Sequence, residues 1–375
     1  VKDMATALFL MLASAAVGQA LLGAERVSHA QNSVVATLNA VYTIGGTDFG
    51  FGVEAAALSP TKRMEILIFG KDGIVRLLKG FGRGPQILKV MGKQVPQWGF
   101  SGRKVAYSHN GTAALTCDDA CALWSMKSQT LIDVWEFDGV CLISFSPTRE
   151  RFLISAEDNT VEVRSASTGD RILKVGGYAM PVRKAVFSPR AERILLVRRD
   201  EPCVEVWDIE TREVTRLYFS DTDTDPEVSV LANKMKTKPF YFNSAVFAPD
   251  GEQILTVHPD RTFKVWDSRG GKLLRSKKTL DDLLSAAFSP SGEQILTVDK
   301  GGARVWNTTT SDVIASLRWP DDEEPSTAHF SPDGERVLMA RHSSAALWDA
   351  RTGERLATLE GHTGDLRSAE FSADG

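Results

Sequence analysis

The sequence predicts an all-β protein built from a repeated unit of strands and turns. In the clearest copy, Phe242 to Asp267, an apolar run ending at Phe247 meets a Pro-Asp-Gly turn, and a β-branched run follows. A second turn, around Asp260, leads into alternating apolar residues that end at Trp266. Apolar runs bounded by turn residues in this way are typical of strands. The unit therefore consists of strand, turn, strand, turn and strand.

Two landmarks of this unit return along the whole chain. The position of Phe247 is taken in the other copies by Leu58, Tyr107, Phe145, Phe187, Phe288, Phe330 and Phe371. The position of Trp266 is taken by Leu78, Trp124, Arg164, Trp207, Trp306 and Trp348, and an aspartate follows three of the tryptophans, as Asp208, Asp267 and Asp349. From Phe247 to Phe371 the first landmark recurs every 41 or 42 residues. A period shared by two landmarks predicts a repeat architecture, here with seven complete units.

The chain resembles the WD-repeat β-propellers over about residues 45–375, because Phe-Ser-Pro-x-Gly and Val-Trp-Asp recur together and in order. Blades of that family are four-stranded sheets of about 40 to 45 residues with a Trp-Asp signature. The resemblance implies that the phenylalanine landmark closes the innermost strand and that the tryptophan lies on the third strand. It also implies that stretches such as 353–359 form the outermost strand. We therefore expect seven complete four-stranded blades, with eight or more left open.

The chain also departs from the family pattern. The Gly-His dipeptide occurs once, at Gly361 and His362, and the seventh unit lacks the turn aspartate that occurs as Asp72, Asp118, Asp158 and Asp260. Most blades therefore cannot build the family's buried network of Asp, His, Ser and Trp. A buried polar network that lacks members is worse than none. We expect a divergent propeller held mainly by apolar burial between blades.

The predicted organisation is an apolar N-terminal segment at 1–33, a propeller at 34–360 and the start of a further, truncated repeat at 361–375. The uncharged stretch Met4–Ala24 fits a signal peptide, a membrane anchor or a buried helix. Residues 34–44 read as a strand that could complete the last blade. Because position 1 is Val and residue 375 follows the first turn of an eighth repeat, the sequence reads as a fragment of a longer protein.

Composition and motifs narrow the function classes. A net charge of −4 and a pI near 6.0 argue against a nucleic-acid-binding surface. We found no nucleophile elbow, phosphate loop or zinc-binding helix motif, so no catalytic, cofactor or metal residues are predicted. Cys117 and Cys121 flank a strand turn where a cross-strand bond or a metal pair is conceivable, but neither Cys-x-x-Cys spacing nor partner histidines accompany them. The four cysteines are therefore predicted to be buried free thiols.

The function expected from this fold is a non-enzymatic interaction scaffold, because a propeller leaves its loops for binding. Two alternatives remain: a sensor or regulatory module of a larger effector protein, and a propeller enzyme with a site at the central channel. The family resemblance implies a cytoplasmic location, whereas a signal or anchor at 4–24 implies a secreted or membrane-anchored protein. Contact with a membrane is expected only if that segment is an anchor.

A partner-binding surface is predicted where acidic runs and aromatic residues share the connections between units. The connection at 220–241 exceeds its equivalents by 19 residues, and two shorter connections lie at 281–282 and 319–324. The predicted binding residues are Asp221, Asp223, Asp225, Glu227, Phe240, Tyr241, Trp319, Asp321, Asp322, Glu323 and Glu324. Aromatic anchors beside charge are enriched at protein interfaces. We therefore expect a protein partner that bears a basic segment.

Overall fold

The computed structural model describes residues 53–359, apart from 61–64, 71–73, 80–85, 94–103, 118–119, 138, 179–181, 199–202, 219–243, 259, 320–324, 326 and 342–343, and it also describes Leu366, Ala369 and Phe371. The regular structure of these residues is entirely β-strand. The chain divides into two units, residues 1–192 and 193–375.

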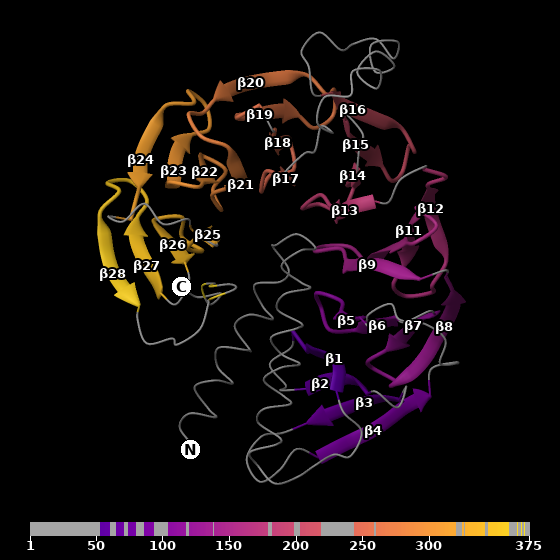
Figure 1. Cartoon of the computed structure of the whole chain (residues 1–375). Helices are drawn as coiled ribbons and strands as arrows, with labels where there is room; N and C mark the ends of the chain where they lie inside the picture. The colour runs from indigo at the N-terminus through magenta and orange to yellow at the C-terminus, as the bar shows by residue number, and fades with distance from the viewer. Residues whose placement is uncertain are drawn as a thin grey trace. The chain divides into compact units, whose positions relative to one another are not determined.

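The first unit contains three complete sheets, each with its strands hydrogen-bonded in chain order (Figure 1). The first sheet consists of β1 (Val53–Leu58), β2 (Glu65–Gly70), β3 (Ile74–Lys79) and β4 (Gln86–Lys93). The second consists of β5 (Lys104–Tyr107), β6 (Ala113–Cys117), β7 (Ala120–Ser125) and β8 (Thr130–Glu136). The third consists of β9 (Val140–Phe145), β10 (Arg151–Ala156), β11 (Val161–Ser165) and β12 (Arg171–Val175).

The fourth sheet begins with β13 (Val182–Phe187) and continues with β14 (Arg193–Arg198), β15 (Cys203–Asp208) and β16 (Val214–Tyr218). The fifth consists of β17 (Ser244–Phe247), β18 (Gln253–Val257), β19 (Thr262–Asp267) and β20 (Leu273–Lys278). The sixth consists of β21 (Leu283–Phe288), β22 (Gln294–Asp299), β23 (Gly302–Asn307) and β24 (Val313–Leu317). The seventh consists of β25 (Thr327–Phe330), β26 (Arg336–Arg341), β27 (Ser344–Asp349) and β28 (Arg355–Leu359). The predicted seven four-stranded antiparallel sheets are confirmed.

Both sequence landmarks keep a fixed place in every sheet. The first landmark, from Leu58 to Phe330, is always the last residue of the first strand, and the tryptophan position is always the second-last residue of the third strand. In the fifth sheet the two landmarks meet the same residue, because Phe247 and Trp266 both pair with Ile254 on β18. The landmarks therefore bracket the second strand of the sheet from both sides.

The core lies between neighbouring sheets, as the sixth and seventh sheets show side by side in Figure 1. Leu296 and Val298 of β22 and Leu317 of β24 form one cluster with Val337 and Met339 of the seventh sheet, and each is at most 3% exposed. A corresponding cluster joins the first and second sheets around Trp124. Burial of a large apolar side chain contributes about 1.5–3 kcal/mol, so each of these interfaces stabilises the fold substantially.

The seventh sheet also carries apolar contacts on its other face. Leu366, Ala369 and Phe371 pack against a small buried cluster formed by Leu338, Ala340 and Ala345. The assignment of 361–375 to a further repeat stays a prediction, as do the domain boundaries at 33 and 360. Among the described residues there is no helix that is long and apolar enough to span a bilayer. Met4–Ala24 and 34–44 lie outside those residues.

The prediction that all cysteines are free thiols is wrong for one pair. Cys117 on β6 lies directly opposite Cys121 on β7, and a disulfide joins them. Direct opposition across an antiparallel pair brings the two Cβ atoms within about 4.5–5.5 Å, which is why the bond closes without a Cys-x-x-Cys spacing. Cys203 on β15 is a buried thiol, as predicted.

Candidate functional site on the connections of the fifth, sixth and seventh sheets

The tryptophans of the repeat signature are structural residues. Trp124, Trp266, Trp306 and Trp348 are at most 5% exposed, whereas Trp207 is half-buried. Trp306 packs at the interface of the fifth and sixth sheets with Phe263, whose ring centroid lies 5.3 Å away. The clusters that contain Trp124, Trp306 and Trp348 place these side chains between neighbouring sheets.

Three sheets keep a hydrogen bond that the sequence interpretation missed. The indole N–H groups of Trp124, Trp266 and Trp306 donate to the second-strand hydroxyls of Thr116, Thr256 and Thr297 at 2.9, 2.8 and 2.8 Å. In the fifth sheet Thr256 Oγ1 also lies 2.7 Å from Nε2 of the buried His258. A recurring Leu-Thr dipeptide eight to ten residues before the tryptophan is the signal that could have revealed these bonds.

The third and fourth sheets carry a buried glutamate on the third strand, near the tryptophan position, whereas the second, fifth and sixth sheets have the threonine on the second strand. Glu205 on β15 is 1% exposed and accepts the Trp207 indole N–H at 3.0 Å, and it pairs with Arg198 and Arg216 at 3.1 and 3.2 Å. Burial lowers the pKa of Arg216 and the Glu205 carboxylate raises it, with a net rise.

In the third sheet Arg164 takes the tryptophan position. It pairs with Glu162 at 2.7 Å, and its guanidinium carbon lies 4.5 Å from the centroid of the Trp135 ring. Both glutamates stand two residues before the tryptophan position. In each of these two sheets the buried glutamate is therefore paired with arginine.

The aspartates that follow the tryptophans cap the next turn. Asp349 Oδ1 accepts the backbone N–H groups of Thr352 and Arg351 at 2.7 and 2.9 Å. These two bonds hold the pKa of the Asp349 carboxyl below its usual value. Asp208 and Asp267 accept equivalent backbone bonds, and so does Asn307 in the sixth sheet. This position therefore needs a side-chain acceptor rather than a negative charge.

One of the predicted binding connections, β20–β21, lies within the described residues. We call it, together with the β18–β19 turn, the connection rim (Arg261 and Thr279–Asp282). Thr279 donates its N–H and its hydroxyl to the Arg261 carbonyl at 2.7 and 2.8 Å, and Arg261 Nη1 donates to the Leu280 carbonyl at 3.3 Å. These bonds fix the backbone on both sides of Leu280, whose side chain is 78% exposed.

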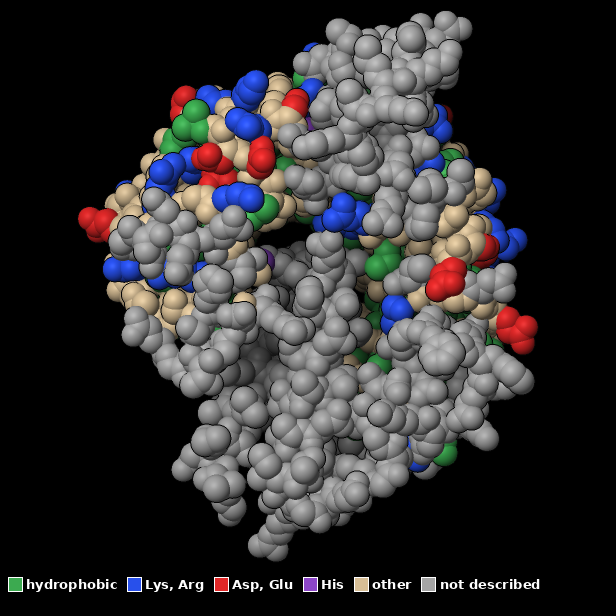
Figure 2. Space-filling model, viewed as in Figure 1, with side chains coloured by type: hydrophobic (Ala, Val, Ile, Leu, Met, Phe, Trp, Pro, Cys, Tyr) green, Lys and Arg blue, Asp and Glu red, His purple; other side chains and the backbone are tan. Residues whose placement is uncertain are grey.

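The two aspartates of the connection rim are paired with arginines. Asp282 Oδ1 lies 3.0 Å from Arg261 Nε, and Asp281 Oδ2 lies 3.3 Å from Nη2 of Arg304. Arg304 also pairs with the buried Asp299 at the end of β22. Figure 2 likewise shows Lys and Arg side chains interspersed with Asp and Glu side chains over β19–β24. The connection rim therefore presents an apolar side chain flanked by neutralised charges.

Trp319, predicted as an exposed aromatic anchor, is buried. It is 3% exposed within the core between the sixth and seventh sheets, and its ring meets Trp348 edge-on at a centroid distance of 5.9 Å. Arg341 lies over the Trp319 ring, with its guanidinium carbon 4.0 Å from the centroid. Two residues beyond β24 the chain still follows the sheet interface, so the ring packs inward. Trp319 therefore contributes to the fold and does not present its ring to a partner.

The other predicted binding residues, Asp221, Asp223, Asp225, Glu227, Phe240, Tyr241, Asp321, Asp322, Glu323 and Glu324, lie outside the described residues. Their part in binding stays a prediction. Among the residues that the structure describes, no group of three or more His, Cys, Asp or Glu side chains is placed to hold a metal ion.

Comparison with known proteins agrees with this architecture. The family model described as WD domain, G-beta repeat, matches residues 236–267, a stretch that includes Trp266 and Asp267. A search of curated proteins found no match to the chain.

Several solved structures are similar over most of their length. Saccharomyces cerevisiae Sqt1 has a TM-score of 0.59 at 14% identity, covering 85% of this chain and 87% of that one. The β-propeller domain of Myceliophteria thermophila Cps50 (Swd1) has a TM-score of 0.50 at 16% identity, covering 72% and 89%. The computationally designed Ika8 protein has a TM-score of 0.57 at 18% identity, covering 84% and 89%.

Seven four-stranded antiparallel sheets with cores between neighbours define a β-propeller. The matched repeat and the similarity to Sqt1 and Swd1 identify its type: the chain has the WD-repeat β-propeller fold.

Proposed function

We propose that this chain is a non-catalytic scaffold that binds protein partners through the connection rim and the two other predicted connections, at 220–241 and 319–324. The observation that carries the proposal is the presentation of Leu280. Its side chain is 78% exposed while the backbone around it is held by Thr279 and Arg261. A pre-ordered backbone lowers the entropy lost on binding, so an exposed apolar residue on such a segment can contribute affinity.

The charges near this residue indicate the kind of partner. Because Asp281 and Asp282 are already paired with arginines, they add little net field. The acidic runs at 221–227 and 321–324 belong to equivalent connections between an outermost and an innermost strand. A partner with a basic segment would be steered by these runs, while an apolar contact with Leu280 would slow its dissociation.

The test compares two exposed apolar residues of the same unit. Leu280→Ser changes the connection rim, and Val313→Ser changes the outermost strand β24, where Val313 is 49% exposed. Partners are captured with wild-type protein from extracts of the cells that make it, and their affinities are then measured by surface plasmon resonance. Leu280→Ser is expected to weaken binding about tenfold, or about 1.4 kcal/mol, whereas Val313→Ser should leave it unchanged.

A third variant separates charge from contact. Changing Asp321, Asp322, Glu323 and Glu324 to Ser is expected to lower the association rate and to flatten its dependence on salt, since steering by exposed charges is screened. Equal binding by wild type, Leu280→Ser and this variant would contradict the proposal. Trp319→Ala is unsuitable as a binding probe, because truncation of its buried ring would disturb the fold.

A further inference from the structure

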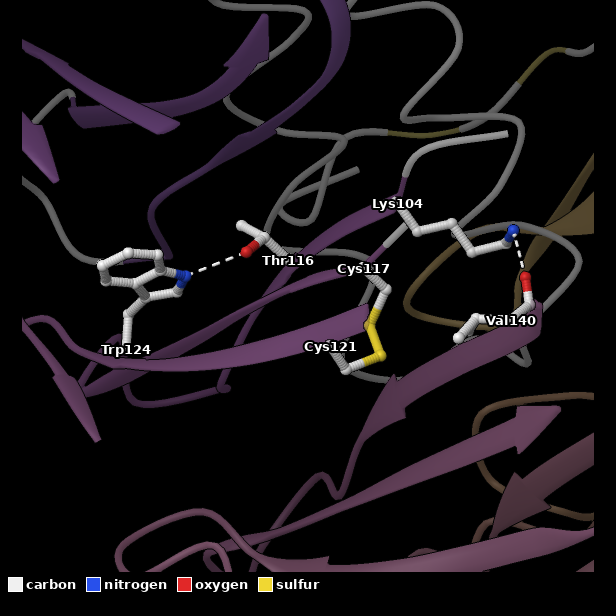
Figure 3. The surroundings of a disulfide bond; sticks show 6 residues. All are labelled: Lys104, Thr116, Cys117, Cys121, Trp124 and Val140. Atoms are coloured by element: carbon white, nitrogen blue, oxygen red, sulfur yellow. Dashed lines mark hydrogen bonds between the residues drawn. A yellow bond between two sulfur atoms is a disulfide. The ribbon is translucent and has the colours of Figure 1, made fainter. Parts of the chain in front are cut away.

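The disulfide of the second sheet joins residues that lie directly opposite on neighbouring strands. Cys117 on β6 pairs in register with Cys121 on β7, and their Cα atoms are 4.1 Å apart (Figure 3). The bond therefore spans the end of one hairpin and needs no contact from elsewhere in the chain. It can form as soon as this hairpin forms.

Once the first unit is folded, the bond is inaccessible. Both cysteines are 0% exposed and belong to a cluster with Val140 and Ile143 of β9 and Phe152 of β10. Lys104 on β5 donates to the Val140 carbonyl at 2.7 Å and adds a polar contact between the second and third sheets (Figure 3). Thiol–disulfide exchange requires a thiolate to reach a sulfur atom, and the packed third sheet prevents this approach.

Burial thus sets an order of events. The thiolate of one cysteine attacks the disulfide of an oxidised carrier and forms a mixed disulfide. The thiolate of the second cysteine then attacks the bonded cysteine sulfur, and the carrier leaves as a dithiol. Two thiols of the chain are oxidised by two electrons while the carrier disulfide is reduced by two. Both steps need an open sulfur, so they precede the packing of the second sheet against the third.

We infer that Cys117 and Cys121 are oxidised to a disulfide during folding, and that the chain matures in an oxidising compartment that supplies a disulfide carrier. Disulfides persist in such compartments and are rare where thiol reductants are maintained. Cys203 provides the contrast, since it is also buried but remains a thiol. Of the three interpretations of Met4–Ala24, the signal peptide agrees with this inference. The inference itself does not depend on how that segment is interpreted.

The direct test uses protein from the cells that naturally make it, with thiols blocked by iodoacetamide before lysis. Tryptic cleavage after Lys104 and Lys127 releases residues 105–127, which contain both cysteines and no other. We expect this peptide without alkyl groups and lighter by two hydrogen atoms than its reduced form. A peptide carrying two alkyl groups would overturn the inference.

A second test addresses burial. The oxidised chain is exposed to dithiothreitol in native buffer and in guanidinium chloride, and residues 105–127 are followed by mass. We expect the bond to resist reduction in native buffer and to be reduced when the chain unfolds. After reduction and blocking, the denaturation midpoint of wild type and of Cys203→Ser should fall, while that of the double variant Cys117→Ser, Cys121→Ser should not respond. Rapid reduction of the native chain, with no change in midpoint, would contradict the assigned order.

Discussion

The fourth and sixth sheets place opposite charges at the same two positions. In the fourth sheet Arg198, at the end of the second strand, pairs with Glu205 on the third. In the sixth sheet Asp299 stands at the end of the second strand and pairs with Arg304 on the third. The neighbour on the fourth strand changes in step, since Glu205 lies opposite Arg216 and Arg304 lies opposite Ser316. In these two sheets the charges at the two positions therefore neutralise each other, although the signs are exchanged.

The two sheets also treat the tryptophan differently. In the sixth sheet the Trp306 indole donates to a neutral hydroxyl, Thr297, and the charged pair stands beside it. In the fourth sheet the Trp207 indole donates to Glu205 itself. One glutamate thus serves as both hydrogen-bond acceptor and counter-ion in the fourth sheet. Loss of that one carboxylate should therefore disturb more partners than loss of Thr297.

The largest expected effect comes from removing a buried tryptophan. Trp306 is 4% exposed, so Trp306→Ala should lower the free energy of unfolding by about 3–5 kcal/mol, mostly through the cavity left between sheets. Trp207 is half-buried, so Trp207→Ala should cost less. Chemical denaturation followed by circular dichroism measures both. Equal costs would mean that the two tryptophans are equivalent and would weaken the comparison.

Glu205→Gln should follow in size. It removes the carboxylate that Arg198 shares while keeping an oxygen near Trp207, and breaking a buried ion pair on one side costs about 3 kcal/mol. The matched variant is Arg216→Gln, which removes the more exposed arginine partner of Glu205 and leaves Arg198 paired. It should lower the free energy of unfolding by under about 1 kcal/mol, because Arg216 is 45% exposed. A Glu205→Gln variant as stable as wild type would show that the pair is dispensable.

Thr297→Val should have a smaller effect. It keeps the side-chain shape and leaves the Trp306 indole N–H without an acceptor, which costs about 1–3 kcal/mol. Thr297→Ser keeps the hydroxyl and serves as the control. The denaturation midpoint of Thr297→Ser should be higher than that of Thr297→Val. The reverse order would mean that this hydrogen bond does not stabilise the sixth sheet.

The smallest effect concerns acid stability. Because the folded-state pKa of Asp349 is lowered, its carboxylate stabilises the fold above the unfolded pKa of about 3.9, and this stabilisation is lost as the pH falls below that value. Asp349→Asn should keep the turn, since Asn307 caps the equivalent turn in the sixth sheet. The variant should match wild type at pH 7 and lose less stability from pH 5 to pH 2. Parallel pH profiles would remove Asp349 as a contributor.

Periodicity predicted the sheets and the place of each landmark because both depend on local alternation and turns. The Cys117–Cys121 bond escaped prediction because it depends on the register of β6 and β7, which residue spacing alone does not fix. In the sequence, Arg164 appeared only as a departure at the tryptophan position. In the structure it pairs with Glu162, two residues earlier on β11, and lies over the ring of Trp135 on β8. These contacts take the place of those that a tryptophan would make.

The candidate site was predicted less well. Trp319 stands beside an acidic run in sequence, and composition could not reveal that the chain keeps its ring inside the sheet interface. The paired state of Asp281 and Asp282 depends on Arg304 and Arg261, which lie 20 or more residues away in sequence. Counting acidic residues in the sequence therefore overestimated the negative charge that the β20–β21 connection presents.

Transplanting the sixth-sheet arrangement into the fourth sheet tests most directly whether the two arrangements of the neutral pair are interchangeable. The triple variant Arg198→Asp, Glu205→Arg, Arg216→Ser reproduces Asp299, Arg304 and Ser316 at the equivalent positions. The measurement is its free energy of unfolding in guanidinium chloride beside that of Glu205→Arg alone. We expect the single variant to be strongly destabilised and the triple variant to recover more than half of the loss. A triple variant no more stable than Glu205→Arg would contradict the account.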